Sequence, residues 1–146
     1  MIAKQLFNDS VVPLKPTDTG TYAIAQMEGC RLSHLPIVDE QDFLGVISDK
    51  DIMTIHEPDL GIGKYKLSLS SAYVTEEQHI YEIIKTFSTL NLTMLPVVNA
   101  KNQYLGTITL TTLVQHLADM AAIHNPGGVI VLEITDKDYS LAELAQ

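Results

Sequence analysis

The side chains best suited to chemistry are a hydroxyl and a carboxylate three residues apart, Ser48 and Asp51. They stand where an apolar run ends and a helix is expected to begin, so both would lie on one face of that helix. An ionised carboxylate only accepts hydrogen bonds, and its two oxygens match the two donors of a sugar cis-diol. The N-terminal amides of a helix also favour a phosphate. The spacing therefore suits a ligand that contains ribose and phosphate.

The same spacing has a purely structural explanation. A serine followed three residues later by an acid is close to a capping box, in which the two side chains satisfy backbone N–H groups of the first helical turn. A cap of this kind needs no ligand, and the spacing alone favours it. Both interpretations of Ser48 and Asp51 stay open at this point.

Other kinds of reactive site lack the residues they need. The five histidines include no His-x-x-x-His pair, and the single Cys30 has no metal-binding or nucleophile motif around it, so we expect no metal site. Gly61–Lys64 resembles the end of a phosphate-binding loop, but Pro58 replaces its first glycine and Tyr65 follows the lysine. No Gly-x-Ser-x-Gly sequence or convincing acid–base pair is present. We therefore expect a protein that is not an enzyme and requires no cofactor.

Composition narrows the class of protein further. The 146 residues include 18 acidic and 9 basic side chains, for a formal net charge of −9, which disfavours nucleic acid as a partner. No apolar run approaches the roughly 20 residues that a membrane helix needs, so no membrane partner is expected. One cysteine cannot form a disulfide within the chain, and this fits a reducing compartment. These features predict a cytoplasmic protein.

The elements that must position Ser48 and Asp51 belong to an internal repeat. Leu32–Val38 (LSHLPIV) matches Leu92–Val98 (LTMLPVV) at an offset of 60 residues. Phe43–Ser48 (FLGVIS) matches Tyr104–Thr109 (YLGTIT) at an offset of 61, so the intervening turn has gained one residue. Two ordered matches indicate a duplication rather than chance similarity of composition.

Each copy predicts a short extended piece, a helix, a two-stranded hairpin and a closing helix. In the second copy Ile80, Ile83 and Phe87 recur at helical spacing, and in the first Thr17 and Asp18 could cap the corresponding helix. The pattern predicts an α/β (α+β) fold of two β-α-β-β-α repeats. The predicted ranges are 11–14 and 72–74 for the extended pieces, 35–38, 43–48, 95–98 and 104–109 for the strands, and 1–60 and 61–124 for the repeats.

A repeat of about 60 residues is too small to bury much apolar surface alone. We therefore expect the two repeats to pack on each other about a pseudo-twofold axis. Such packing would leave two equivalent crevices at their seam.

The chain at this point resembles the cystathionine-β-synthase (CBS) domain, and the tandem resembles a CBS pair, or Bateman module. The resemblance rests on Leu35–Asp39 with Gly45–Asp51, and on Leu95–Asn99 with Gly106–Thr109, and covers about residues 2–124. It implies a regulatory module that binds AMP, ADP, ATP or S-adenosylmethionine in the seam. It also implies a homodimer.

The resemblance assigns ribose binding to Ser48 and Asp51 and so places ligand use slightly ahead of the cap. It places the adenine slot between the first extended piece and the Leu-Pro strand, although Val12 and Leu35 considered singly are ordinary core residues. The phosphates of a nucleotide would need cations, and those nearest to the motif in the sequence are Lys50, Arg31 and His34. Of these, Arg31 is better interpreted as a solvated surface residue. The remaining candidate ligand-binding residues are Val11, Pro13, His34, Lys50 and Thr109.

The second copy departs from this pattern. Thr109 keeps the hydroxyl, but Thr112 stands where the carboxylate would be. A hydrogen bond to a charged group contributes about 1.5–3 kcal/mol, so its loss would weaken ribose binding tenfold or more. We expect one competent crevice and one that is degenerate or empty.

The last residues, 125–146, break the repeat. A strand is expected near 129–134, followed by a capped helix that begins at Ser140, and the segment resembles the truncated start of an ACT-like domain. A CBS pair followed by such a domain is similar to the acetoin-utilisation accessory proteins. The sequence thus predicts a non-enzymatic module that senses an adenine nucleotide. The alternative is a structural dimerisation module with empty crevices.

Overall fold

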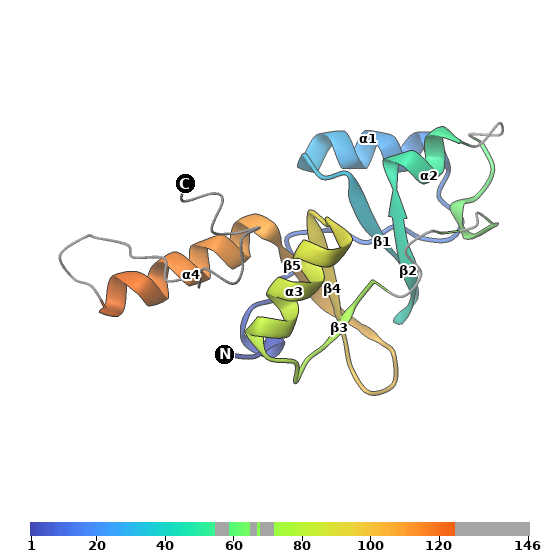
Figure 1. Cartoon of the computed structure of the whole chain (residues 1–146). Coiled ribbons are helices and arrows are strands. Elements are labelled where there is room, and N and C mark those ends of the chain that lie inside the picture. Colours follow the sequence, from blue (N-terminus) through green and yellow to red (C-terminus); the bar gives the residue numbers. More distant parts are fainter. Residues whose placement is uncertain (55–58, 65–66, 68–71, 125–146) are drawn as a thin grey trace. The chain divides into compact units, whose positions relative to one another are not determined.

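A computed structural model of the chain describes residues 1–54, 59–64, 67 and 72–124 (Figure 1). The chain divides into two compact units, Met1–Leu110 and Thr111–Gln146, and each is treated by itself below. Helices and small sheets alternate within it, which confirms the α+β fold expected for a CBS pair. The elements are η1 (Ala3–Gln5), α1 (Gly20–Cys30), β1 (His34–Asp39), β2 (Asp42–Ser48), α2 (Asp49–Met53), η2 (Ile62–Lys64), β3 (Val74–Thr75), α3 (Ile80–Leu90), β4 (Met94–Val98), β5 (Tyr104–Thr109) and α4 (Leu110–His124).

The first repeat forms the antiparallel hairpin β1–β2. His34 at the start of β1 pairs with Ser48 at the end of β2, and Asp39 pairs with Asp42 at the turn. The predicted extended piece 11–14 is not a continuous strand, because only Leu14 bridges to β1, in parallel with Ile37. Both hairpin strands were predicted to within one residue.

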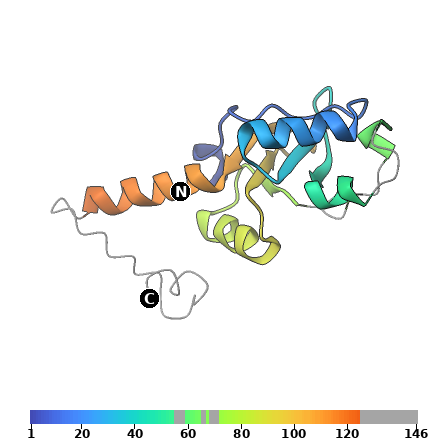
Figure 2. The ribbon, with the colours of Figure 1, turned by 90° about the horizontal axis from the view of Figure 1, so that it is seen from above.

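The second repeat repeats this arrangement. β4 and β5 form an antiparallel hairpin that begins with Met94 opposite Thr109, and β3 pairs in parallel with β4 through Val74 and Val97. The extended piece predicted at 72–74 is the two-residue strand β3, which begins two residues later and ends one residue later than predicted. Figures 1 and 2 show α1 beside the first hairpin and α3 beside the second.

The helix ends show how closely the two repeats follow one path. The N-cap of α1 is Thr19, whose hydroxyl accepts a hydrogen bond from the Tyr22 N–H, so the cap predicted at Thr17 and Asp18 is wrong by one or two residues. At their C-terminal ends α1 and α3 each stop at a left-handed residue, Arg31 with φ of 57° and Asn91 with φ of 56°.

Short segments are exchanged between the two repeats. The N-terminal segment bonds to the second repeat, where the N–H groups of Ala3 and Lys4 donate to the carbonyls of Gln78 and Glu76 at 2.8 and 2.9 Å. In return Ile62 donates to the Asp18 carbonyl at 2.8 Å and is wholly buried in the core of the first repeat. The remaining buried members of that core cluster are Val11, Leu14, Ala23, Met27, Leu35, Ile37, Ile47 and Ile52.

The hairpin turns meet with reciprocal hydrogen bonds. Phe43 N–H donates to the Asn102 carbonyl at 3.1 Å, and Tyr104 N–H donates to the Gln41 carbonyl at 2.8 Å. The donors are 61 residues apart and so are the acceptors, which makes the two bonds equivalent under the duplication. This reciprocity is the pseudo-twofold relation that the repeat predicted.

The remaining helix, α4, contains all the described residues of the second unit. Among the described residues, none of the helices is long and apolar enough to cross a membrane. The ACT-like segment predicted at 125–146 lies outside the described residues.

Candidate functional site

The hairpin register brings several of the predicted ligand-binding residues to one end of the first repeat. His34 is paired with Ser48, so the start of β1 lies beside the end of β2. Leu14 bridges in parallel to Ile37, so the segment before α1 passes beside β1. The hairpin register thus places the start of β1 beside the start of α2.

Ser48 and Asp51 form a reciprocal cap at this location. The Ser48 Oγ accepts a hydrogen bond from the Asp51 N–H at 3.1 Å, and the Asp51 Oδ2 accepts one from the Ser48 N–H at 3.1 Å. Ser48 is buried and Asp51 is partly exposed. The capping box considered in the sequence is therefore present at the start of α2, and it engages one carboxylate oxygen of Asp51.

His34 joins this site to the second repeat. Its Nδ1 lies 3.1 Å from the Ser33 hydroxyl and 3.1 Å from the Thr93 hydroxyl of the other repeat. Burial lowers the pKa of the half-buried imidazole, and the nearby carboxylates of Asp49 and Asp51 oppose this shift. A neutral imidazole between two hydroxyls is therefore the favoured state near neutral pH.

The apolar candidates separate into two kinds. Leu35 is 1% exposed and belongs to the core cluster, which agrees with its interpretation as an ordinary core residue. Val12 is 75% exposed, so its interpretation as a core residue is wrong. Val12 is instead an apolar side chain displayed on the surface beside Pro13.

The polar candidates lie at the ends of the two hairpins. Lys50 is exposed in the first turn of α2, and Arg31 is exposed at the end of α1, as expected for solvated surface. Thr109 is partly buried opposite Met94, so the second repeat has a methionine where the first has His34. The hydroxyl is conserved between the two hairpins, whereas the imidazole is not.

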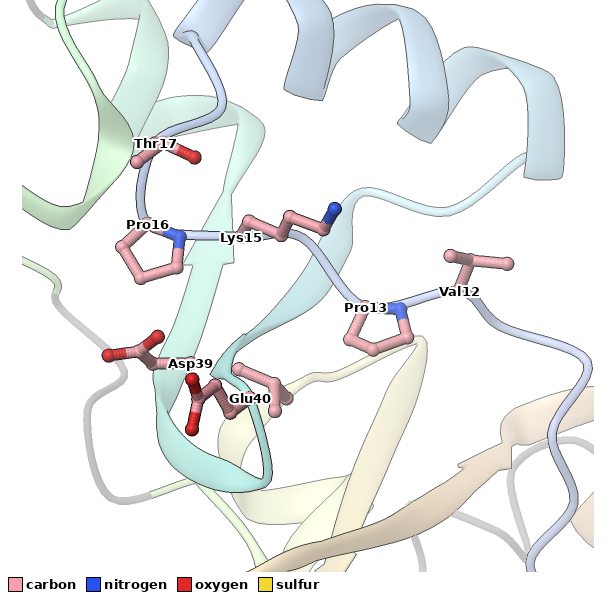
Figure 3. Close-up of a pocket in the computed structure, with 8 residues that line it drawn as sticks. Val12, Pro13, Lys15, Pro16, Thr17, Asp39 and Glu40 are labelled. Atoms are coloured by element: carbon pink, nitrogen blue, oxygen red, sulfur yellow. The ribbon is translucent and has the colours of Figure 1, made fainter.

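A cavity of about 520 Å³ lies beside the first extended segment, and Figure 3 shows its lining. Val12 and Pro13, two of the predicted ligand-binding residues, line it. Its other lining residues come from the turn end of β1 and from the chain that leads into α1. They are Lys15, Pro16, Thr17, Val38, Asp39 and Glu40.

This cavity does not include the rest of the predicted set. Ser48, Asp51, His34, Leu35, Lys50 and Thr109 are absent from its lining. In Figure 3 the Lys15 ammonium points away from the carboxylates of Asp39 and Glu40. The sequence missed these three charges because they lie in the segment before α1, at the last residue of β1 and in the turn after it, where no periodicity marks them. Within the described ranges, no group of three His, Cys, Asp or Glu side chains is placed to hold a metal ion.

Comparison with known proteins identifies the duplicated unit. A model of the CBS domain matches residues 3–57 and 68–119, which together make up more than half of the chain. Among curated proteins, the inosine-5′-monophosphate dehydrogenase of Methanocaldococcus jannaschii is 27% identical over 114 residues, or 77% of this chain. The chain spans only 23% of the length of that relative.

Solved structures share the arrangement of the two repeats. A CBS domain pair/ACT domain protein from Thermotoga maritima has a TM-score of 0.72 at 21% identity, covering 82% of this chain and 98% of that one. A structure named for the acetoin utilization protein AcuB of Vibrio cholerae has a TM-score of 0.71 at 20% identity, over 86% and 96% of the chains. CBSX2 in complex with AMP has a TM-score of 0.69 at 16% identity, over 82% and 97%. At these identities the likeness shows the fold.

Proposed function

Because the chain belongs to the CBS domain family, and its two repeats form a CBS pair, we propose that it is a regulatory module that binds an adenosine-containing ligand. The observation that carries the proposal is the register of the first hairpin, which pairs His34 with Ser48 and so brings the start of β1 beside the start of α2. The ligand class is AMP, ADP, ATP or S-adenosylmethionine. The CBSX2 structure with AMP supports the nucleotide, since that protein shares this fold.

The proposed contacts follow from the chemistry of each side chain. Asp51 and Ser48 bind the ribose hydroxyls from the start of α2. Val12, Pro13 and the backbone of His34–Leu35 hold the adenine, and Lys50 lies in the first turn of α2 for a phosphate. Thr109 takes the place of Ser48 in the second repeat, where binding is weaker because Thr112 replaces the carboxylate.

Binding changes the protein only if the ligand prefers one packing of the repeats. The His34–Thr93 contact at 3.1 Å links the proposed crevice to the second repeat. A ligand that shifts the start of β1, where His34 lies, would therefore alter this contact between the two repeats. This gives a physical route from occupancy to a regulatory response.

The test is isothermal titration calorimetry of the full chain with AMP, ADP, ATP and S-adenosylmethionine. One of them should bind, and at about 100 times its Kd it should add about 2.7 kcal/mol to the free energy of unfolding. Asp51→Ala should remove the binding heat, whereas Arg31→Ala, at an exposed position outside the crevice, should leave it unchanged. Binding that is equal in Asp51→Ala would contradict the assignment.

One observation favours a second candidate, a structural dimerisation module without a ligand. Ser48 and Asp51 already satisfy each other's backbone N–H groups, so the pair has a role in the absence of any nucleotide. Under this alternative none of the four compounds binds, and Asp51→Ala only lowers stability.

The wider organisation of the protein forms part of the proposal. We infer a cytoplasmic homodimer of a non-enzymatic protein, with functional repeats at 1–60 and 61–124. Analytical ultracentrifugation tests the dimer through the mass of the full chain in solution. A sedimentation mass of a single chain at all concentrations would contradict it.

A further inference from the structure

A second cavity lies at the turn end of the second repeat's hairpin. Its volume is about 500 Å³, within the range of small-molecule sites. Residues from β2, β3 and the turn between β4 and β5 line it, so it lies where the two repeats meet within the first unit. The lining residues are Phe43, Leu44, Tyr73, Thr75, Val98, Asn99, Ala100 and Asn102.

This cavity occupies the position equivalent to the cavity of the first repeat. Five of its lining residues stand 60 positions after residues that line the first cavity. The duplication therefore formed two comparable hollows, whose chemistry can be compared position by position. The pairs are Pro13 with Tyr73, Lys15 with Thr75, Val38 with Val98, Asp39 with Asn99, and Glu40 with Ala100.

In each pair that differs in charge, the charged residue belongs to the first cavity. Three charged residues line the first cavity, and none of the described residues that line the second carries a charge. Asn99 replaces a carboxylate by an amide of similar shape, and Ala100 opens space where Glu40 has a long side chain. The second cavity is therefore suited to an uncharged ligand.

An aromatic pair forms one wall of the second cavity. The rings of Phe43 and Tyr73 meet edge to face, with centroids 5.7 Å apart and an interplanar angle of 67°. Phe43 is buried, whereas Tyr73 is 39% exposed and so presents ring surface to a ligand. A planar ring can stack on such a surface.

The polar groups around this wall are held in place. Asn102 Nδ2 donates to the Phe43 carbonyl at 3.1 Å, and Asn99 Oδ1 accepts from the N–H groups of Lys101 and Gln103 at 2.9 and 3.0 Å. The hydroxyl of Thr75 adds a group that both donates and accepts. Fixed amides and a hydroxyl next to an aromatic face match the nitrogens and exocyclic groups of a heterocycle.

We propose that this second cavity binds a neutral heteroaromatic ring, such as a nucleobase without ribose or phosphate. The site uses Tyr73 as a stacking surface and Asn99 and Thr75 as polar contacts. It shares none of its lining residues with the crevice proposed for the nucleotide, so either site can be absent without the other.

The experiment follows the backbone amide signals of the ¹⁵N-labelled full chain during a titration with free adenine. Adenine is uncharged at pH 7 and lacks the hydroxyls that Asp51 would bind. The expected result is saturable shifts at Tyr73, Thr75 and Asn99. Ala100→Glu, which restores the first cavity's residue at an exposed position, should weaken binding about tenfold or more.

Matched variants separate this site from the others. Tyr73→Ala should also weaken adenine binding about tenfold, because the stacking surface is lost. Glu40→Ala, at the equivalent position of the first cavity, and Asp51→Ala should leave adenine binding unchanged. Unchanged melting temperatures of Ala100→Glu and Glu40→Ala would show that both are folded.

Three outcomes would overturn the proposal. The first is the absence of shifts up to the solubility limit of adenine. The second is binding of equal strength in Ala100→Glu and Tyr73→Ala. The third is shifts confined to Val12 and His34 that disappear in Asp51→Ala, since these would place adenine in the nucleotide crevice.

Discussion

The two repeats follow one backbone path but use it for different chemistry. In the first, β1 begins with His34 paired to Ser48, and in the second β4 begins with Met94 paired to Thr109. The equivalent cavities at the turn ends differ in the same way, with charged side chains lining only the first among the described residues. The comparison shows that the fold depends on backbone and core positions, while exposed turn and strand-end positions are free to acquire different chemistry.

Even where the two repeats have the same residue, the physical reason that requires this residue differs between them. Gly45 and Gly106 are equivalent in the hairpins, 61 positions apart. Gly45 has φ of 151°, which side-chain-bearing residues rarely adopt, so its backbone conformation requires glycine. Gly106 is required by contact, because a Cβ there would collide with the Phe7 ring and lie 2.8 Å from the Asn8 carbonyl oxygen.

The largest expected effect is therefore that of Gly106→Ala. The added methyl group should displace the N-terminal segment from β5 and lower the free energy of unfolding by about 2 kcal/mol or more. Urea denaturation measures the change. Gly29→Ala is the control, since its Cβ meets nothing within 4 Å and alanine favours the helix, so stability should rise by about 0.5–1 kcal/mol. Equal effects of the two substitutions would contradict the exchange of segments.

Removal of the Ser48 cap should have an intermediate effect. Ser48→Ala leaves the Asp51 N–H without its side-chain acceptor and should cost about 1 kcal/mol in thermal or urea unfolding. Thr19→Ala removes the hydroxyl cap of α1 and should cost a similar amount. Only Ser48→Ala should also weaken nucleotide binding. If both caps affect stability alone, the structural module is the better account.

A smaller effect is expected at the left-handed residues that end α1 and α3. Asparagine tolerates this conformation better than arginine does, and glycine adopts it without strain. Arg31→Gly should therefore raise the free energy of unfolding by about 0.5–1 kcal/mol, and Asn91→Gly should raise it less. Chemical denaturation of the two variants in parallel measures the difference. A larger gain at Asn91 would show that the two helix ends are not equivalent.

The finest distinction between the repeats is the pH dependence that His34 introduces. Burial lowers the pKa of His34 in the folded protein below its ordinary value of 6.5, so below that pH the unfolded chain binds more protons. His34 therefore makes stability fall as the pH decreases from 6.5 toward the lowered pKa, and contributes no such loss above 6.5. Melting temperatures of His34→Gln should show a shallower decline across this window. A decline as steep as that of the unaltered protein would contradict the burial of this imidazole.

The sequence predicted the duplicated pattern because hairpins and helices leave local signatures. The strands around the Leu-Pro segments were predicted nearly to the residue, and the apolar stripe that contains Ile83 lies within the helix α3. The exchange of Ala3 and Ile62 between repeats was not predicted, because the contacts they make depend on residues far away in the chain. The exposure of Val12 was missed for the same reason. The sequence of an extended segment is the same whether or not distant residues bury its apolar side chains.

The candidate site was predictable only in part. The Ser48–Asp51 spacing correctly indicated a cap, and the alternative that it also binds ribose stays a prediction. The two cavities were not predicted at their turn ends, because turn residues such as Glu40 and Ala100 follow no periodic pattern. Their equivalence could have been noticed only by carrying the offset of 60 through the turns.

The most direct measurement of the central claim is a crystal structure of the full chain with AMP. The account predicts the ribose hydroxyls at the Asp51 carboxylate, the adenine beside Val12 and Leu35, and weaker or no occupancy near Thr109. AMP bound elsewhere, with Asp51 engaged only in its cap, would contradict the claim that the first repeat carries the nucleotide site.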